Sequence, residues 1–330
     1  MKRRILVIVG ILIIVLLLFF ADLEELREYF GRISLWQWGL MLLLQSISLF
    51  LLSFQLHKVL EVMEVKSSYR KILSVYTTGT FVESITPSVK AGGEATKVYL
   101  IHRKMGTPVS VGTAAVTFQK SISFLSFFVL AGLAILVFLM NQGIGDELGK
   151  VLLGVFLGLV FLFLFILWAL FFSKIEHVVK RLPLKEERKT LMIMGAKTFR
   201  TSLRLAFAQK KAMGFHLLLS FSIWALFPLK AYLVSTFLGT GLSFSEVSVA
   251  TYLTYMVGLL PLLPGGLGTF EGSMVLILAP FGIRTTLGVS FAIVLRMVTF
   301  WIPLAITGSY VFFNNLLHKR RSGELGSNDR

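Results

Sequence analysis

The chain alternates long apolar stretches with short polar ones, and this pattern predicts a polytopic α-helical membrane protein. A helix needs roughly 17–25 predominantly apolar residues to cross the hydrocarbon core of a bilayer. Stretches of this kind occur at residues 5–21, 35–56, 111–140, 151–172, 213–238 and 288–313. The pattern therefore predicts an all-α fold with six transmembrane helices.

Two further apolar stretches, 72–101 and 246–281, are interrupted midway by proline and glycine. Each half has roughly ten to fifteen residues, too few to cross a bilayer alone. Non-helical backbone persists at membrane depth only where protein or a wet cavity covers it. The pattern therefore predicts two re-entrant helical hairpins, whose breaks contain Thr86, Pro87, Gly92, Gly93, Pro264, Gly265, Gly266 and Gly268.

Lysine and arginine are distributed unequally between the polar segments. With both termini in the cytoplasm and six alternating spans, the cytoplasmic segments hold 24 of these residues and the external segments hold four. An excess of this size follows the positive-inside rule. It predicts a multi-pass protein of the cytoplasmic membrane, in which the first hairpin enters from the cytoplasm and the second from outside.

This topology divides the chain into two halves of opposite orientation, 1–150 and 151–315, followed by a polar tail at 316–330. A basic linker at 174–212 is predicted to face the cytoplasm, with a solvated helix at 185–189. A shift of 177 positions pairs Pro87 with Pro264 and Glu94 with Glu271, and a shift of 176 pairs Lys120 with Arg296 and Phe124 with Phe300. Inverted repeats with broken helices are typical of secondary transporters.

Composition narrows the possible functions. The chain is 55% hydrophobic, has a mean hydropathy of +0.80 and contains no cysteine, which excludes disulfides and thiol nucleophiles. A net charge of +16 is compatible with nucleic-acid binding, but the basic residues lie between the spans, as in membrane proteins. We therefore predict no nucleic-acid partner.

Five basic residues and three glutamates lie at membrane depth within the apolar stretches, where each costs on the order of 2.5–3.5 kcal/mol on insertion scales. We expect this positive excess to suit a substrate with one or two negative charges. Both hairpins are predicted to direct a helix N-terminus into the protein, at about Glu94 and at about Phe270, and such termini attract anions. Lys230 either has a functional role or snorkels to the outer interface, and the role of Glu83 stays open. The residues predicted to bind the substrate are Lys90, Glu94, Lys97, Lys120, Glu271 and Arg296.

Glu94 and Glu271 have two interpretations. They contact the substrate or a coupling ion, or they neutralise Lys120 and Arg296 and favour the helix dipole at their own first turns. The five histidines are scattered, and no nucleophile elbow or Walker motif occurs. The sequence therefore predicts no catalytic residue, no metal site and no cofactor.

The break around Pro87, the segment from Leu263 to Gly272 (LPGGLGTFEG), Arg296 and the Trp301-Ile302-Pro303 sequence resemble the transmembrane region of lysylphosphatidylglycerol synthase, a flippase-like family. The resemblance covers residues 5–315. In that family such a region accompanies an aminoacyl-transferase domain, or a glycosyltransferase acting on dolichyl phosphate. Neither catalytic domain is found in this sequence, so the resemblance implies lipid translocation.

The leading hypothesis is ATP-independent flipping of an anionic phospholipid or a polyprenyl phosphate between leaflets. An alternative is a membrane enzyme, or enzyme subunit, that transfers an aminoacyl or glycosyl group to a lipid, with Glu94 or Glu271 as base. A third is a scaffold for a separate lipid-modifying enzyme, suggested by the basic linker alone.

Overall fold

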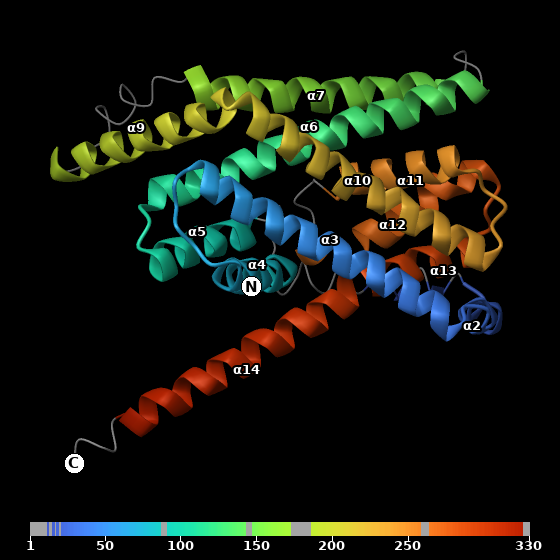
Figure 1. Cartoon of the computed structure of the whole chain (residues 1–330). Helices are drawn as coiled ribbons and strands as arrows, with labels where there is room; N and C mark the ends of the chain where they lie inside the picture. The colour runs from blue at the N-terminus through green and yellow to red at the C-terminus, as the bar shows by residue number, and fades with distance from the viewer. Residues whose placement is uncertain are drawn as a thin grey trace. The chain divides into compact units, whose positions relative to one another are not determined.

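The computed structural model of the chain describes residues 21–86, 91–142, 147–172, 186–258 and 264–325, preceded by residues 12, 15, 16, 18 and 19. Within these residues all regular secondary structure is helical, as the hydropathy pattern predicts. The helices (Figure 1) are α2 (Leu23–Gly31), α3 (Leu35–Val62), α4 (Tyr69–Ile85), α5 (Ala91–Met105), α6 (Val109–Gln142), α7 (Glu147–Phe172), α9 (Glu186–Ala208), α10 (Lys210–Leu238), α11 (Phe244–Val257), η1 (Pro264–Gly266), α12 (Thr269–Leu278), η2 (Ala279–Phe281), α13 (Thr285–Arg296), the π-helical turn η3 (Met297–Trp301) and α14 (Ile302–Leu325).

Helices in the described residues that are long and apolar enough to cross a bilayer are Leu35–Val62, Val109–Met140, Lys210–Leu238 and Thr285–Asn314. They confirm the second, third, fifth and sixth predicted spans. The fourth predicted span is covered by α7, a single helix of 26 residues. The first predicted span, at 5–21, lies almost entirely outside the described residues. The total of six spans therefore stays a prediction.

The first interrupted stretch consists of α4 and α5, separated by residues 86–90. Their 17 and 15 residues measure about 25 and 22 Å, less than the roughly 30 Å of a hydrocarbon core. α5 begins at Ala91, earlier than the start expected near Glu94. Gly92 and Gly93 therefore lie in the first turn of α5 and not in the break, which corrects the prediction. Pro87 and Lys90 lie outside the described residues.

The second interrupted stretch consists of α11 and α12, with η1 inside the break. Gly265, Gly266 and Gly268 have φ angles of +61°, +68° and +74°. Side chains with a Cβ rarely adopt this left-handed region, which explains why glycine occupies all three positions. The break ends where α12 begins at Thr269, close to the predicted start at Phe270.

The chain forms two compact units. Unit 1 contains residues 1–45, 70–97 and 254–330, and unit 2 contains 46–69 and 98–253. The break-proximal parts of both hairpins belong to unit 1, together with α2, α13 and α14. The predicted halves, 1–150 and 151–315, each contribute segments to both units, so the inverted repeat does not coincide with this division and stays a prediction.

The basic linker is more structured than expected. Residues 186–208 form α9, which packs on α6 and buries Leu203 and Ala206. The Phe207 ring contacts Phe118 with centroids 4.9 Å apart. The solvated helix predicted at 185–189 therefore belongs to a longer helix, because apolar residues further along α9 have a partner in unit 2. Residues 174–185 of the linker lie outside the described residues.

Unit 2 also contains a proline inside a span. Pro228 has no N–H to donate within α10, and the Tyr252 hydroxyl donates instead to the carbonyl of Trp224, four residues earlier, at 3.3 Å. Lys230 follows this position and is fully buried. Its ammonium donates to Ser48 at 3.1 Å and lies 4.6 Å from the centre of the Phe227 ring. Snorkelling to an interface, one role considered for Lys230, does not match this burial.

Candidate functional site

Arg296 is the last residue of α13, and its guanidinium reaches into the break of the second hairpin. Its Nε donates to Oε1 of Glu271 at 3.2 Å, and its Nη2 donates to the carbonyl oxygen of Gly265. Both side chains of the ion pair are buried, with 10% of Arg296 and 5% of Glu271 exposed. The guanidinium thus provides a hydrogen-bond donor for a backbone carbonyl of the short 3-10 helix η1 in the break.

Aromatic rings lie close to this guanidinium. The Arg296 Cζ is 4.7 Å from the centre of the Phe270 ring and 4.2 Å from that of Phe300. Phe270 comes from the first turn of α12, and Phe300 comes from the π-helical turn η3. π-helical turns occur frequently at functional sites. Cation–π contacts stabilise a desolvated cation, and they direct its hydrogen bonds into the guanidinium plane.

Glu271 has a second role at the start of α12. Its Oε2 accepts a hydrogen bond from the backbone N–H of Gly268 at 2.8 Å, as in a capping box. Both carboxylate oxygens are therefore engaged, one with the helix start and one with Arg296. The structure thus contains the ion pair in which Glu271 neutralises Arg296. The Glu271 carboxylate fixes both the start of α12 and the position of the guanidinium.

The first hairpin contains its own buried cation. Lys97 is 3% exposed, and its Nζ lies 3.4 Å from Oε1 and 3.5 Å from Oε2 of Glu94, one turn earlier in α5. The same Nζ lies 4.4 Å from the centre of the Tyr76 ring, which comes from α4. Glu94 therefore pairs with a lysine of its own helix.

Glycines allow α4 and α5 to approach closely around Lys97. A Cβ built on Gly79 would lie 2.5 Å from Cγ of Lys97, and one on Gly93 would lie 2.7 Å from the carbonyl oxygen of Gly79. The lysine stem therefore occupies the space that a side chain at position 79 would fill. Small residues at a helix interface bring backbones together in this way in membrane proteins.

The two hairpins contact each other within unit 1. A Cβ built on Gly265 would lie 3.0 Å from the carbonyl oxygen of Ser84, near the end of α4, and 2.8 Å from the Phe300 ring. A Cβ on Gly308 of α14 would lie 3.0 Å from the Phe81 ring. The break of the second hairpin therefore packs against the end of the first helix of the first hairpin.

The structure brings together part of the predicted site. Glu94 with Lys97 and Glu271 with Arg296 form ion pairs, and all four residues belong to unit 1. Lys120 belongs to unit 2, where its Nζ lies 5.8 Å from the Phe124 ring, and Lys90 lies outside the described residues. With Glu83 included, the described part of unit 1 contains three carboxylates and two cations among the residues predicted to lie at membrane depth. The excess of positive charge expected at the site is therefore not found in this part of the chain.

Tyr76, Gly79, Phe270 and Phe300 were not among the predicted site residues. One signal for Phe300 was present, because the repeat shift that aligns Lys120 with Arg296 also aligns Phe124 with Phe300. In each half the cation lies over the aromatic ring four residues later, at 5.8 Å for Lys120 and 4.2 Å for Arg296. Matching local contacts in the two halves agree with a repeat.

A comparison with protein families matches residues 7–307 to the model described as the lysylphosphatidylglycerol synthase TM region. Among curated proteins, the UPF0104 membrane protein PH1989 of Pyrococcus horikoshii is 24% identical, over 96% of this chain and 98% of its own length. A UPF0104 membrane protein of Methanothermobacter thermautotrophicus is 21% identical, over 92% of this chain and 93% of its own. The chain is thus similar to these relatives over nearly its full length.

Proposed function

The chain belongs to the family of the lysylphosphatidylglycerol synthase TM region, as its break motifs suggested, and from this premise we propose that it moves an anionic lipid between bilayer leaflets without ATP. The substrate is a phospholipid or a lipid-linked phosphate such as a polyprenyl phosphate. The finer architecture belongs to the same proposal: six spans and two hairpins that enter the cytoplasmic membrane from opposite sides, with both termini in the cytoplasm. A separate lipid-modifying enzyme as partner is proposed with it.

The observation that supports the proposal is the hydrogen bonding of the Arg296 guanidinium. A guanidinium has five N–H donors. Among the described residues its hydrogen bonds go to Glu271 and Gly265, through Nε and Nη2. Three N–H donors, two on Nη1 and one on Nη2, therefore remain for the oxygens of a phosphate. The planar fork of arginine matches such oxygens, and the ammonium of lysine does not.

The ion pairs suggest how a charged headgroup passes. Taking one partner away from a buried ion pair costs roughly 3–5 kcal/mol, so Arg296 does not leave Glu271 without a replacement. An incoming phosphate supplies that replacement, and its departure restores the pair. The hairpins, packed together at Gly265 and Ser84, alternate between openings toward the two leaflets, as inverted hairpins do in secondary transporters.

The alternative transferase function requires a carboxylate that takes up a proton from an acceptor group. Both oxygens of Glu271 are engaged, with Arg296 and with the Gly268 N–H, so this carboxylate is poorly placed to act as a base. Glu94 lies beside the Lys97 ammonium. We therefore propose no catalytic step for this chain.

The test measures headgroup exposure of a fluorescent phosphatidylglycerol in proteoliposomes, with thermal stability recorded alongside. Replacing Arg296 by Gln should abolish lipid movement and also lower stability, because Glu271 then stays buried without its partner. Adding Glu271→Gln should restore stability but not lipid movement, and Arg296→Lys should recover only part of the lipid movement. Arg27→Gln, at an exposed arginine of α2, is the matched control and should retain full activity.

A purely structural role for Arg296 predicts a different pattern. Arg296→Gln would again lower stability, but adding Glu271→Gln would restore stability and lipid movement together. Full activity in the double variant would remove Arg296 from the phosphate path. Mass analysis of lipids incubated with the purified chain detects covalent transfer, an outcome that would favour the alternative function.

A further inference from the structure

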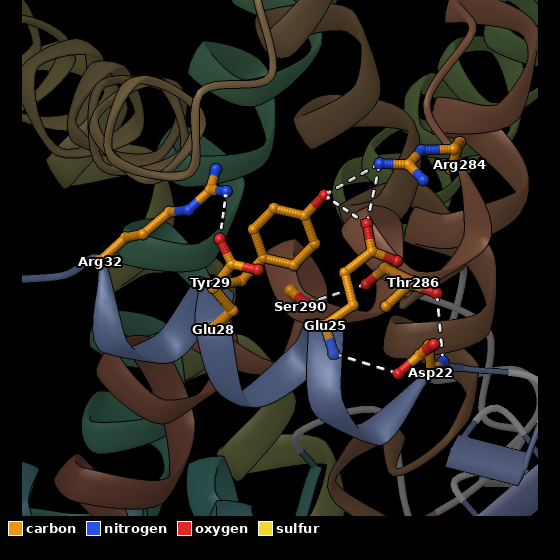
Figure 2. A network of polar contacts seen from close by, with 8 residues as sticks. All are labelled: Asp22, Glu25, Glu28, Tyr29, Arg32, Arg284, Thr286 and Ser290. Carbon is orange, nitrogen blue, oxygen red and sulfur yellow. Dashed lines mark hydrogen bonds and ion pairs between the residues drawn. The ribbon is translucent and has the colours of Figure 1, made fainter.

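A polar cluster connects α2 to the start of α13 (Figure 2). Arg296 lies at the opposite end of α13. Glu25 is its centre, because its Oε1 accepts from Nη2 of Arg284 at 2.8 Å and from the hydroxyl of Tyr29 at 2.9 Å. The same Nη2 of Arg284 lies 3.4 Å from the Tyr29 oxygen. The cluster therefore joins residues that lie more than 250 positions apart in the chain.

A backbone contact and apolar packing reinforce this connection. The backbone N–H of Asp22 donates to Oγ1 of Thr286 at 3.2 Å, while the Asp22 carboxylate caps α2. Thr286 in turn accepts, through its carbonyl oxygen, from Ser290. Apolar side chains of the N-terminal segment, α2, α12 and α13 also pack together: Leu18, Ala21, Leu26, Val275, Val289 and Ile293.

Tyr29 is suited to hold the centre of the cluster. Its side chain is 5% exposed, whereas 73% of the Arg284 side chain and 26% of Glu25 are exposed. Burial, and after it the hydrogen bond to Glu25, raises the pKa of Tyr29. The hydroxyl therefore remains protonated and donates to the carboxylate at all physiological pH values.

The helices joined by this cluster are the ones that carry the buried ion pair. α12 begins with Glu271 in its first turn and ends near η2, and α13 then runs back to Arg296. The turn between them includes Gly282, with φ of +77°, and leads directly into Arg284. The cluster thus fixes the connected ends of α12 and α13, and the ion pair lies at their other ends.

We infer that Asp22, Glu25, Tyr29, Arg284 and Thr286 form a positioning element, here named the α2 latch, that controls how readily the Glu271–Arg296 pair opens. The inference rests on the proposed function, because it assigns a role to that opening. Latch residues contact no substrate and act through α12 and α13. Loss of the Glu25–Arg284 contact frees the connected ends, and the site ends of the two helices then separate more often.

A matched control lies on the same helix. Glu28 and Arg32 form an ion pair of the same length, 2.8 Å, but both belong to the α2 region and do not reach α13 (Figure 2). A variant without this local pair loses a similar contact while the connection to α13 remains. It therefore separates the effect of the latch from the effect of weakening α2.

The experiment uses the absence of cysteine in the chain. Thr269→Cys places a single thiol in the first turn of α12, where Thr269 is half-buried and donates to the Gly266 carbonyl. The rate of maleimide labelling in detergent micelles then reports how often the site end of α12 opens. Ser220→Cys, at a buried position of α10 in unit 2, reports global unfolding.

Glu25→Gln and Arg284→Gln should each raise labelling at position 269 by about twofold to fivefold, the range that exposed ion pairs contribute. The charge swap Glu25→Arg with Arg284→Glu should return the rate toward the parent value. Glu28→Gln should leave it unchanged, and labelling at position 220 should not respond. Tyr29→Phe, which keeps the ring, should raise the rate at position 269 less than Arg284→Gln.

Unchanged labelling at position 269 in both latch variants would overturn the inference, as would an equal rise with Glu28→Gln. Labelling requires no lipid movement, so the two proposals fail separately. A latch that behaves as expected in a protein that moves no lipid would refute the proposed function alone. Lipid movement with no effect of the latch variants on labelling would refute only the latch.

Discussion

Replacing Gly93 by Ala tests whether the close approach of α4 and α5 holds the first hairpin together. A Cβ at this position would lie 2.5 Å from Cβ of Glu83, 2.7 Å from the Gly79 carbonyl oxygen and 3.1 Å from Cα of Glu83. Carbon atoms in contact prefer separations of about 3.5–4.0 Å. Two of the three neighbours are backbone atoms, so the helices themselves have to separate by roughly 1 Å.

The expected magnitude follows from two opposing terms. Alanine in a helix interior is favoured over glycine by about 1 kcal/mol, while overpacking of this kind costs typically about 1–3 kcal/mol. Separation of the helices also moves Lys97 away from Tyr76 and Glu94, whose contacts with it are 4.4 and 3.4 Å long. The two terms leave a net loss of roughly 0–2 kcal/mol, and weakening of the Lys97 contacts adds to this loss.

Intrinsic tryptophan fluorescence during heating at a fixed scan rate measures this loss. For a protein of 330 residues the apparent Tm should fall by roughly 1–2 °C for each kcal/mol. Gly214→Ala is the matched control, because this helical glycine of α10 has no atom within 4 Å of the added Cβ. The control should gain about 0.5–1 kcal/mol. Equal stability of Gly93→Ala and Gly214→Ala would refute the argument that α4 and α5 meet at Gly93.

Two further predictions follow from the same features. Lys97→Met should lower stability by less than the roughly 3–5 kcal/mol of a fully buried pair, because Glu94, whose side chain is 21% exposed, then loses this cation. Adding Glu94→Gln should recover most of the loss, and a double variant as unstable as the single one would contradict the pairing. For the topology, a cysteine at Arg103 should react only with reagents on the cytoplasmic side, and one at Thr285, which is exposed at the start of α13, only with reagents outside. Reaction of both from one side would exclude hairpins of opposite orientation.

Hydropathy and local chemistry were sufficient to predict the helical segments that the structure describes and the second break, whereas Gly92 and Gly93 were wrongly assigned to the first break. The break at 264–268 is predictable from the sequence because proline and glycine determine the local backbone conformation. Gly265 does adopt a positive φ. The pairing of Glu271 with Arg296 was one of two interpretations, since a deep carboxylate and a deep cation have few other partners. These features depend on a few residues or on the low dielectric of the membrane interior.

The contacts between α4 and α5 could not be predicted from the sequence. The Tyr76 ring lies under the Lys97 ammonium. The separation of the two residues in the sequence does not predict this contact, because it depends on how α4 is rotated against α5. That rotation is set by Gly79 and Gly93, whose role appears only when the facing atoms are known. The start of α5 was misplaced for the same reason, because glycines that normally weaken a helix are here required for its packing.

The two hairpins share a plan but neutralise their equivalent glutamates differently. Glu271 is held by Arg296, which comes from the following span, whereas Glu94 is held by Lys97 of its own helix. The repeat shift that aligns Glu94 with Glu271 places Met274 opposite Lys97. Met274 is fully buried, and its sulfur accepts from Thr254 at 3.5 Å. Within the described residues, the second hairpin therefore has no local cation at this position.

Under the proposed function, this asymmetry determines which pair opens for a lipid phosphate. Lys97 and Glu94 belong to one helix and are one turn apart, so no rigid movement of α5 separates them. Arg296 and Glu271 belong to different helices, and their 3.2 Å contact depends on how α12 and α13 lie against each other. A movement between these helices exposes the Arg296 guanidinium while the first hairpin keeps its charges paired. In the proposed mechanism, the second hairpin is therefore the part of unit 1 in which binding of an anion is coupled to a change of conformation.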